Sequence, residues 1–255
     1  MRPPILPERD CNYADQMAVS MARLLRDGER VFHGVASPLP MVAIQLARRL
    51  HAPNLVYLNI AGGVNAFPDR LPASTADPIL AKKSPTILPL WETFDLSARG
   101  GLDTVFLSGV QIDRYGRINL TVIGEFFKPK VRLPGGAGSA ALMPTAKRTI
   151  LWRTKHTTKT FVEKLDFATA APSTGLRAGG RVDRIVTPLC VFAFRDGEIY
   201  VEGIHPYTTP HEVMENTGFP IEVDSTTPVI PPPSEEELQA LEALDPQGIR
   251  LLEFR

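Results

Sequence analysis

Residues 31–60, VFHGVASPLPMVAIQLARRLHAPNLVYLNI, decide the fold. The apolar run at 31–36 predicts a buried strand, and the spacing of apolar residues at 39–50 predicts an amphipathic helix that ends near Pro53. A second apolar run at 54–60 predicts the next strand. Two strands joined by a helix form the unit from which parallel sheets are built. We therefore expect an α/β fold with an open, mostly parallel sheet flanked by helices.

The rest of the chain adds further elements to this unit. Ser or Thr followed three residues later by Glu predicts helix starts after Thr209 and Ser234, and the proline-rich run at 228–233 predicts an extended linker. We expect one α/β domain over residues 1–225, and a proline-rich linker and C-terminal helix, packed on the same domain, over 226–255. The other expected elements are helices at 12–26 and 90–98, strands at 103–110, 149–152 and 161–167, and an added hairpin within 188–205 that turns at Asp196-Gly197.

The composition is that of an ordinary globular protein and disfavours several partners. The 255 residues are 44% apolar, and 28 basic residues balance 28 acidic ones, so no net field attracts nucleic acid or an anionic membrane. No stretch has the roughly 18 apolar residues of a membrane span, and residues 1–10 lack the apolar core of a signal peptide. Cys11 and Cys190 are the two cysteines, which fits a reducing compartment. We therefore expect a cytoplasmic protein with no nucleic-acid or membrane partner.

The sequence lacks the motifs of several enzyme classes. Its five histidines never fall at a metal-ligand spacing such as HExxH, so we expect no metal site. It has no Gly-x-Ser-x-Gly elbow, and neither cysteine lies in a nucleophile motif. It also has no GxxxxGK[ST] loop. These absences disfavour serine or cysteine hydrolysis and P-loop nucleotide chemistry.

A glycine-rich loop at 131–142 is the most suggestive local feature. Its segment 136–141, GAGSAA, matches the G-x-G-x-x-A of dinucleotide-binding turns. Arg132 and Pro134 stand where such a turn needs an apolar strand, and residues 153–160 offer no acid for a ribose, so a dinucleotide site is disfavoured. Two interpretations stay open. The loop is an ordinary strand-to-helix turn, or its backbone N–H groups bind an oxyanion such as a polarised thioester carbonyl.

Basic residues gather around the expected strand at 149–152. We interpret them as a solvated sheet edge rather than as phosphate ligands. They are Lys147, Arg148, Arg153, Lys155 and Lys159.

Several motifs, in the same order along the chain, resemble the beta subunit of glutaconate CoA-transferase and its relatives, the family I CoA transferases. The most specific is 109–119, GVQIDRYGRIN, which resembles the family signature Gly-x-Gln-(Ile/Val)-Asp-x-x-Gly-Asn-x-Asn, with Arg117 in place of the usual asparagine. The similarity extends from about Cys11 to the terminal helix. The other matching segments are 34–40, 47–53, 135–139, 161–167 and 212–219.

The resemblance implies an alpha subunit of similar fold, in a heterodimer or heterotetramer, with the active cleft between the subunits. It also implies an acyl-CoA substrate and no cofactor beyond the coenzyme A that is part of it. In the transferases a glutamate in a turn after a strand attacks the acyl-CoA and becomes a glutamyl-CoA thioester. Ile60 occupies that position here, and no Asp or Glu occurs between Arg30 and Phe67. Ping-pong transfer by this subunit is therefore disfavoured.

Two other activities of the superfamily fit a chain without this glutamate. One heterodimer decarboxylates a branched glutaconyl-CoA, and another hydrolytically opens a steroid-derived ring in a CoA thioester, with its catalytic glutamate on the alpha subunit. We therefore expect the beta subunit of an enzyme that decarboxylates or hydrolyses a carboxylated acyl-CoA. The alternatives are a true transferase whose carboxylate comes from the alpha subunit, and a non-catalytic subunit that binds a partner.

The expected substrate-binding residues fall in two groups. The first follows the strand at 54–60 and faces the thioester, and the second forms an anion-binding or oxyanion loop. An apolar Ile60 would lower the local dielectric and strengthen the N–H contacts of that loop. The catalytic acid or base is not identified. The two groups are Asn59, Ile60, Ala61 and Gly62, and Gly135, Gly136, Ala137 and Gly138.

Overall fold

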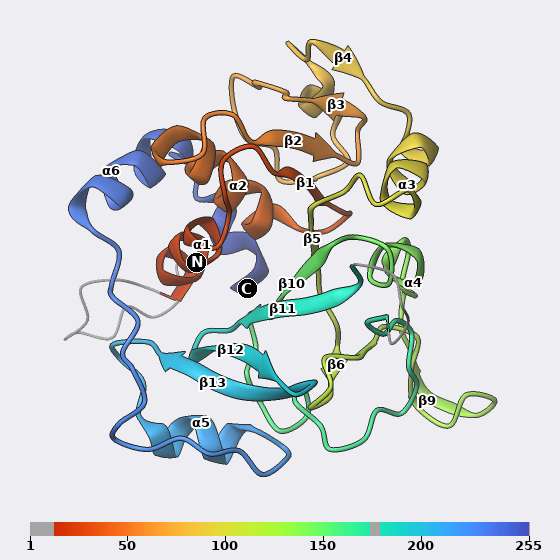
Figure 1. Ribbon diagram of the computed structural model, residues 1–255, viewed down its shortest axis with the longest axis vertical. Coiled ribbons are helices and arrows are strands. Elements are labelled where there is room, and N and C mark those ends of the chain that lie inside the picture. The colour runs from red at the N-terminus through yellow and green to blue at the C-terminus, as the bar shows by residue number, and fades with distance from the viewer. Residues whose placement is uncertain (1–12, 174–178, 255) are drawn as a thin grey trace. The chain divides into compact units, whose positions relative to one another are not determined.

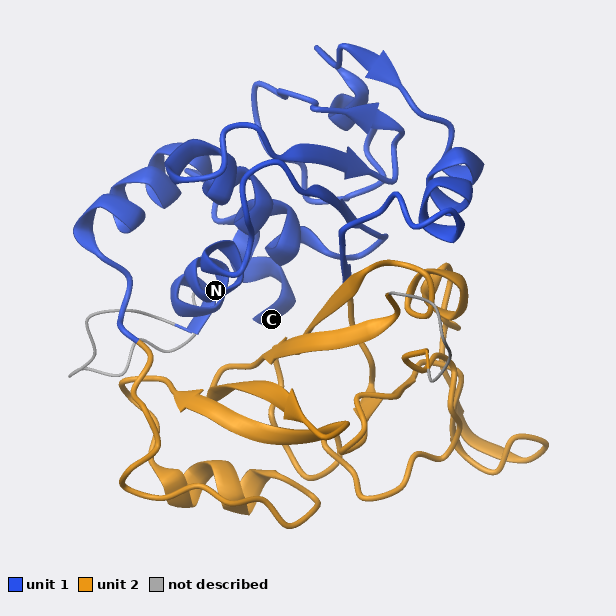
Figure 2. Cartoon of the chain, in the orientation of Figure 1, with its two compact units in different colours: residues 1–106, 231–255 blue, residues 107–230 orange. Residues whose placement is uncertain are grey.

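The computed structural model describes residues 13–173 and 179–254 (Figure 1). The chain divides into two compact units, one of residues 1–106 and 231–255 and one of residues 107–230 (Figure 2). The expected α/β fold is confirmed, because helices accompany parallel strand pairs that antiparallel strands extend. The expected domain boundary at 225/226 stays a prediction. Residues 1–12, which include Cys11, lie outside the described residues.

The first unit contains the strand–helix–strand element that decides the fold. Strand β1 pairs in parallel with both β2 and β5, and β3 and β4 extend the order to β5-β1-β2-β3-β4. His33 at the end of β1 lies in register with Asn59 at the end of β2. The elements are α1 Tyr13–Arg23, β1 Arg30–His33, α2 Pro38–Leu50, β2 Val56–Asn59, β3 Gly63–Val64, η1 Pro78–Ala81, β4 Thr86–Ile87, α3 Leu90–Ala98, β5 Thr104–Leu107, α6 Glu235–Leu244 and η2 Ile249–Phe254.

Helices α1 and α2 form the buried layer of this unit, and α6 and η2 pack on α2 (Figure 1). Arg250 of η2 is buried and donates to Asp15 of α1 at 2.5 Å, to Glu242 of α6 at 2.7 Å and to Asp245 at 3.1 Å. A buried guanidinium is tolerated because carboxylates surround it. The C-terminal segment is thus attached to the first unit by both apolar and ionic contacts.

The second unit carries a four-stranded arrangement in the order β10-β11-β12-β13, in which β10 and β11 are parallel. The expected hairpin is confirmed, and it turns at Asp196-Gly197, whose φ angles of +53° and +85° suit a two-residue turn. The elements are β6 Gln111–Ile112, β7 Ile118–Asn119, β8 Val122–Gly124, β9 Pro129–Arg132, α4 Ser139–Leu142, β10 Arg148–Trp152, β11 Arg181–Val186, β12 Cys190–Arg195, β13 Glu198–Ile204 and α5 Pro210–Asn216.

The helix starts that the sequence predicts near the C-terminus are both present. Ser234 accepts a hydrogen bond from the Glu237 N–H while Glu237 accepts one from the Ser234 N–H, a complete capping box for α6. Thr209 caps α5 by accepting from the Glu212 N–H at 3.2 Å. Among the described residues, no helix combines the length and the apolar character of a membrane span.

The prediction of a strand at 161–167 is wrong. Phe161 and Val162 form only isolated bridges, to Ile112 and Gly218, and the chain then leaves the pairing. The alternation of apolar and polar residues resembled a strand, but the Asp166 N–H donates to the Gln111 side chain at 3.1 Å instead of to a neighbouring strand. In this segment, hydrogen bonding to a side-chain acceptor replaces backbone pairing with another strand.

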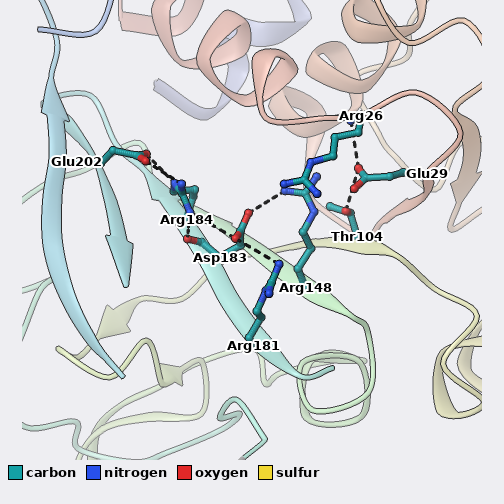
Figure 3. Close-up of polar contacts among 8 residues, drawn as sticks. All are labelled: Arg26, Glu29, Thr104, Arg148, Arg181, Asp183, Arg184 and Glu202. Atoms are coloured by element: carbon teal, nitrogen blue, oxygen red, sulfur yellow. Dashed lines mark hydrogen bonds and ion pairs between the residues drawn. The ribbon is translucent and has the colours of Figure 1, made fainter. Parts of the chain in front are cut away.

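The interpretation of Arg148 as part of a solvated edge is also wrong. Arg148 is only 3% exposed, and it donates to Asp183 of β11 at 2.8 Å (Figure 3). On the same strand Arg184 pairs with Glu202 of β13 through two bonds of 2.6 and 2.7 Å. Because its charges have partners on β10 and β13, β11 lies inside the sheet although its sequence, RVDRIV, looks exposed. For this reason the strand was not predicted.

Candidate functional site

The turn after β2 is shaped by Asn59, whose side chain is 2% exposed. The Asn59 Nδ2 donates to the carbonyls of Gly63 and Leu80, each at 3.0 Å, and its Oδ1 accepts from the Gly63 N–H at 3.3 Å. A Cβ on Gly63 would lie 2.1 Å from the Leu80 carbonyl oxygen, so only glycine fits. Ile60 and Ala61, both half-buried, lie at the outer part of this rigid turn.

The loop after β1 lies beside this turn, because β1 and β2 are parallel neighbours that end in register. The His33 Nε2 is 2.7 Å from the Tyr57 hydroxyl, and its Nδ1 is 2.9 Å from the Ser37 hydroxyl. Ser37 donates its own hydrogen to the Gly34 carbonyl at 2.6 Å, so it accepts from His33 Nδ1–H, and Tyr57 donates to Nε2. Burial lowers the pKa of His33 to about 4, which keeps this imidazole neutral.

Carboxyl ends of parallel strands are where open α/β sheets bind ligands. In the first unit that edge carries the 34–37 loop and the 59–63 turn. The 34–37 loop exposes Val35, and Ala36 has a φ of +49°, which is uncommon for a non-glycine residue. The 34–37 loop and the 59–63 turn are thus built largely from backbone and apolar side chains. Residues 31–66 contain no carboxylate.

The glycine loop of the second unit presents several unused backbone donors. Within the described ranges, the N–H groups of Gly136, Ala137 and Gly138 donate no hydrogen bond. Ala137 is left-handed, with φ +44°, and Gly138 is right-handed, with φ −80°, an alternation that turns successive N–H groups toward one concave side. Gly135 differs, because its N–H donates to the Leu120 carbonyl at 2.8 Å. The loop has the form of an anion-binding nest.

The signature segment at 109–119 supports this loop through a hydrogen-bond network with the strands that precede the loop. Asn119 is buried, and its Nδ2 donates at 2.7 Å to both the Gln111 Oε1 and the Val122 carbonyl. The Gln111 Nε2 donates to Asp166 at 3.0 Å, and the Asp166 carboxylate also accepts from the Gly124 N–H. This network fixes the start of β8, whose hairpin with β9 leads into the glycine loop. The most specific motif of the sequence therefore has a structural role.

Gly136 packs against a residue that the sequence did not single out. A Cβ at Gly136 would lie 2.4 Å from the Thr169 methyl group. The Thr169 hydroxyl accepts from the Leu120 N–H at 2.8 Å, and Leu120 in turn holds Gly135. No local signal in the sequence marks Thr169, because its role arises from a contact across more than thirty residues of chain.

The dinucleotide interpretation of the loop finds no support in its surroundings. Strand β9, which precedes the loop, is exposed at all four residues, and helix α4, which follows it, has only four residues. A dinucleotide-binding turn needs a buried strand before it and a full helix after it.

The buried histidines and the buried thiol of the second unit are held in their neutral, unreactive forms. The His156 nitrogens contact the hydroxyls of Thr187 and Thr217 at 2.9 and 3.1 Å, and burial lowers the pKa of His156 to about 3. Burial likewise lowers the pKa of His205 to about 4 and raises that of the Cys190 thiol to about 12. A neutral imidazole beside a protonated thiol offers no activated nucleophile.

The predicted site residues thus lie in two places. Residues 59–62 form the turn at the carboxyl end of β2 in the first unit, and residues 135–138 form the nest in the second. Substrate contact by either group, and their common use, stay predictions. The sequence did not identify His33 or Tyr57, since their pairing depends on the register of β1 and β2.

Proteins that resemble this chain identify its family. The family model for Coenzyme A transferase matches residues 14–216. The chain belongs to the Coenzyme A transferase family. It is 38% identical over 243 residues to the B subunit of 3-oxoadipate CoA-transferase of Pseudomonas knackmussii, with 91% of this chain and 92% of that protein covered.

Two further relatives bear on the chemistry of this family member. The B subunit of glutaconate CoA-transferase of Acidaminococcus fermentans is 26% identical, with 94% of this chain and 91% of that protein covered. A chain in the crystal structure of the decarboxylase AibA/AibB is 30% identical and superposes with a TM-score of 0.87, covering 96% of this chain and 100% of that one. The predicted resemblance to the beta subunit of glutaconate CoA-transferase is confirmed.

Proposed function

We propose that this chain is the beta subunit of a two-subunit enzyme that decarboxylates or hydrolyses a carboxylated acyl-CoA thioester. The observation that carries the proposal is the turn after β2, where Ile60 stands and no carboxylate occurs between Arg30 and Phe67. Isoleucine has no nucleophilic atom, so this chain cannot form a glutamyl-CoA thioester at that turn. The name of the decarboxylase AibA/AibB, a structural relative, supports the first of the two reactions.

In the proposed decarboxylation the carboxyl group of the acyl chain leaves as CO₂. Its bonding electron pair moves through the conjugated chain to the thioester carbonyl, which becomes an enolate oxygen. The N–H groups of Gly136, Ala137 and Gly138 stabilise that oxygen, and a proton from the medium or the alpha subunit later returns to carbon. An apolar Ile60 that faces the thioester would keep the reacting group in surroundings of low polarity.

In the proposed hydrolysis the same N–H groups would stabilise the oxyanion formed when water adds to a carbonyl of the substrate. The attacking water would need a general base from the alpha subunit, because residues 31–66, which form β1, β2 and the loops at their carboxyl ends, offer the neutral, buried His33 and no carboxylate. Both reactions use coenzyme A as part of the substrate and no further cofactor. An acyl-CoA substrate also fits the cytoplasmic location that we infer.

Trapping of a covalent intermediate tests the proposal. The purified two-subunit complex is incubated with a panel of glutaconyl-type CoA esters, with and without hydroxylamine, and products are followed by mass spectrometry. We expect CO₂ or a hydrolysed acid to form at the same rate in both samples, because no enzyme-bound thioester exists for hydroxylamine to attack. Inactivation by hydroxylamine only in the presence of acyl-CoA would refute the proposal.

A second candidate function is CoA transfer with a carboxylate supplied by the alpha subunit. It is favoured by the 38% identity to a protein named as the B subunit of a 3-oxoadipate CoA-transferase. The same trapping experiment identifies it, because the glutamyl thioester would then form on the alpha subunit and hydroxylamine would convert that residue into a hydroxamate. Peptide mass analysis of both subunits locates the modified residue.

A non-catalytic role is the candidate from another class. Such a subunit would have lost its nucleophile and kept only its surface for a partner. Equilibrium dialysis of the complex against coenzyme A distinguishes it, because a purely structural subunit would add no CoA affinity to that of the alpha subunit alone.

A further inference from the structure

A basic pocket of about 220 Å³ lies in the first unit, on the C-terminal half of α2. The loop at 67–71 and the end of α6 complete its wall. With a helical rise of 1.5 Å per residue, Arg48 in this pocket lies about 15 Å along α2 from Pro38, where the 34–37 loop ends. Arg48 therefore lies at the opposite end of α2 from that loop.

Three arginines line this basic pocket without a counter-charge of their own. Arg48, Arg49 and Arg70 all lie on its wall, and among the residues that the structure describes none of them forms an ion pair. The one carboxylate on the wall, Asp69, is bound to Lys83 outside the pocket. Guanidinium groups that outnumber the carboxylates on a wall attract an external anion.

Arg48 is held in place inside the pocket. Its Nη1 donates to the Gln45 Oε1 at 3.0 Å and to the Ala66 carbonyl at 3.2 Å, and its guanidinium lies 5.5 Å from the centre of the Phe67 ring. Its partial burial lowers its pKa, the direction expected of a cation that leaves water without a counter-ion. The Gln45 side chain is 7% exposed, and its Nε2 is buried without a hydrogen-bond acceptor. A bound oxyanion would supply the counter-ion that the Arg48 guanidinium lacks.

The presence of three guanidinium groups on the wall favours an anion with more than two oxygens. Three separate guanidinium groups can each meet a different oxygen of a phosphate, whereas a carboxylate offers only two oxygens. Phe67 is 63% exposed at the rim, where its ring offers a planar apolar face to an organic group joined to the phosphate. We propose that the basic pocket binds a phosphate dianion, either free or as a phosphomonoester. This proposal does not depend on the reaction proposed for the enzyme.

Isothermal titration calorimetry of the full-length chain in a buffer free of phosphate tests the proposal. The probes are inorganic phosphate, 5′-AMP as a phosphomonoester with a planar base, and succinate as a dicarboxylate. We expect saturable binding of phosphate or 5′-AMP with a Kd near 1 mM or below, and weaker binding of succinate. Tighter binding of 5′-AMP than of phosphate, lost in Phe67→Ala, would identify the phosphomonoester, and equal binding would identify the free ion.

Charge-removing variants with a matched control locate the binding site. Arg49→Gln and Arg70→Gln change exposed side chains and should each weaken phosphate binding about tenfold, the effect of one charge-assisted hydrogen bond. Arg99→Gln removes an exposed arginine that directly follows α3, outside the pocket, and should leave the Kd unchanged. The proposal is overturned by absence of saturable binding up to about 20 mM phosphate. Equal weakening in Arg99→Gln, succinate binding as tightly as phosphate, or loss of binding when the alpha subunit is added would also overturn it.

Discussion

At the scale of single residues, Gly136 is the position where the nest tolerates least change. A Cβ there would lie 2.4 Å from the Thr169 methyl group and would displace the loop. We expect Gly136→Ala to lower kcat about 10²-fold to 10³-fold, the loss that follows removal of one oxyanion donor. Steady-state assays with the acyl-CoA substrate measure the change.

The double variant Gly136→Ala with Thr169→Ser tests whether activity is lost through the contact of the new Cβ with Thr169 or through general misfolding. Serine lacks the methyl group that the new Cβ would meet but keeps the hydroxyl that accepts from Leu120. We expect the double variant to recover most of the activity and Thr169→Ser alone to resemble the parent enzyme. Full activity of the single variant, or no recovery in the double one, would contradict the placement of the loop.

Ile60 offers the second test at residue scale. In the proposed reaction Ile60 faces the thioester, so a carboxylate at this position would repel the negative charge that develops on the thioester oxygen. About 1.4 kcal/mol of repulsion lowers the rate tenfold. We therefore expect Ile60→Glu to lose at least about tenfold in kcat, and Ile60→Gln, of the same shape without the charge, to lose less. If Ile60→Glu is as active as Ile60→Gln, charge at this turn does not matter and the proposed role of an apolar residue is wrong.

At the scale of elements, the paired strands β6 and β7 depend on the buried amide of Asn119. In Asn119→Asp a carboxylate oxygen would replace the Nδ2 that now lies 2.7 Å from two acceptors, the Gln111 Oε1 and the Val122 carbonyl. A buried charge that faces acceptors should lower the free energy of unfolding by about 3 kcal/mol or more. Urea denaturation followed by circular dichroism measures this loss.

Asn65→Asp is a matched control for the Asn119 change. The Asn65 Oδ1 accepts from the Tyr57 N–H at 2.8 Å, a role that a carboxylate oxygen can also fill. We expect a change of less than about 1 kcal/mol there, as for other substitutions that leave no buried group unsatisfied. Equal losses in the two variants would show that the amide donors of Asn119 do not hold the signature segment.

Sequence patterns predicted the elements whose local signal agrees with their final surroundings. The alternation of strand and helix at 31–60 predicted β1, α2 and β2 to within three residues. Strands β9 and β11 were missed, because β9 is exposed at all four residues and the charges of β11 have partners only after folding. Pairing between distant segments decides such strands, and a local pattern does not contain it.

The candidate site, like the fold, could be predicted only in part from the sequence. The glycine loop at 135–138 carries its own conformational signal, and three of its N–H groups are free of partners within the described residues. Asn59 was expected to face the thioester, whereas its side chain holds the turn through Gly63 and Leu80. The sequence indicates the position of a residue along a strand, but register and neighbouring carbonyls decide how its side chain is used.

At the scale of the whole molecule, burial of neutral histidines predicts how stability depends on pH. Burial lowers the pKa of His33 and His205 to about 4 and that of His156 to about 3. In the unfolded chain these side chains take up protons near pH 6.5. Between pH 6.5 and about 4 the unfolded state therefore binds more protons than the folded state, and the free energy of unfolding falls as the pH falls.

The stability that each such histidine contributes is fully present above pH 6.5 and is lost as the pH falls through the acid range. Over that range each histidine contributes a slope of up to about 1.4 kcal/mol per pH unit to the free energy of unfolding. We expect urea denaturation at pH 7.5, 6.5, 5.5 and 5.0 to show little change between the first two values and a steep loss below. This range lies above the ordinary pKa of carboxylates, which isolates the histidines. In His156→Gln the slope below pH 6.5 should decrease by about one proton, whatever the stability of the variant at neutral pH. A slope that is the same in the parent protein and in His156→Gln would mean that His156 is not buried in its neutral form.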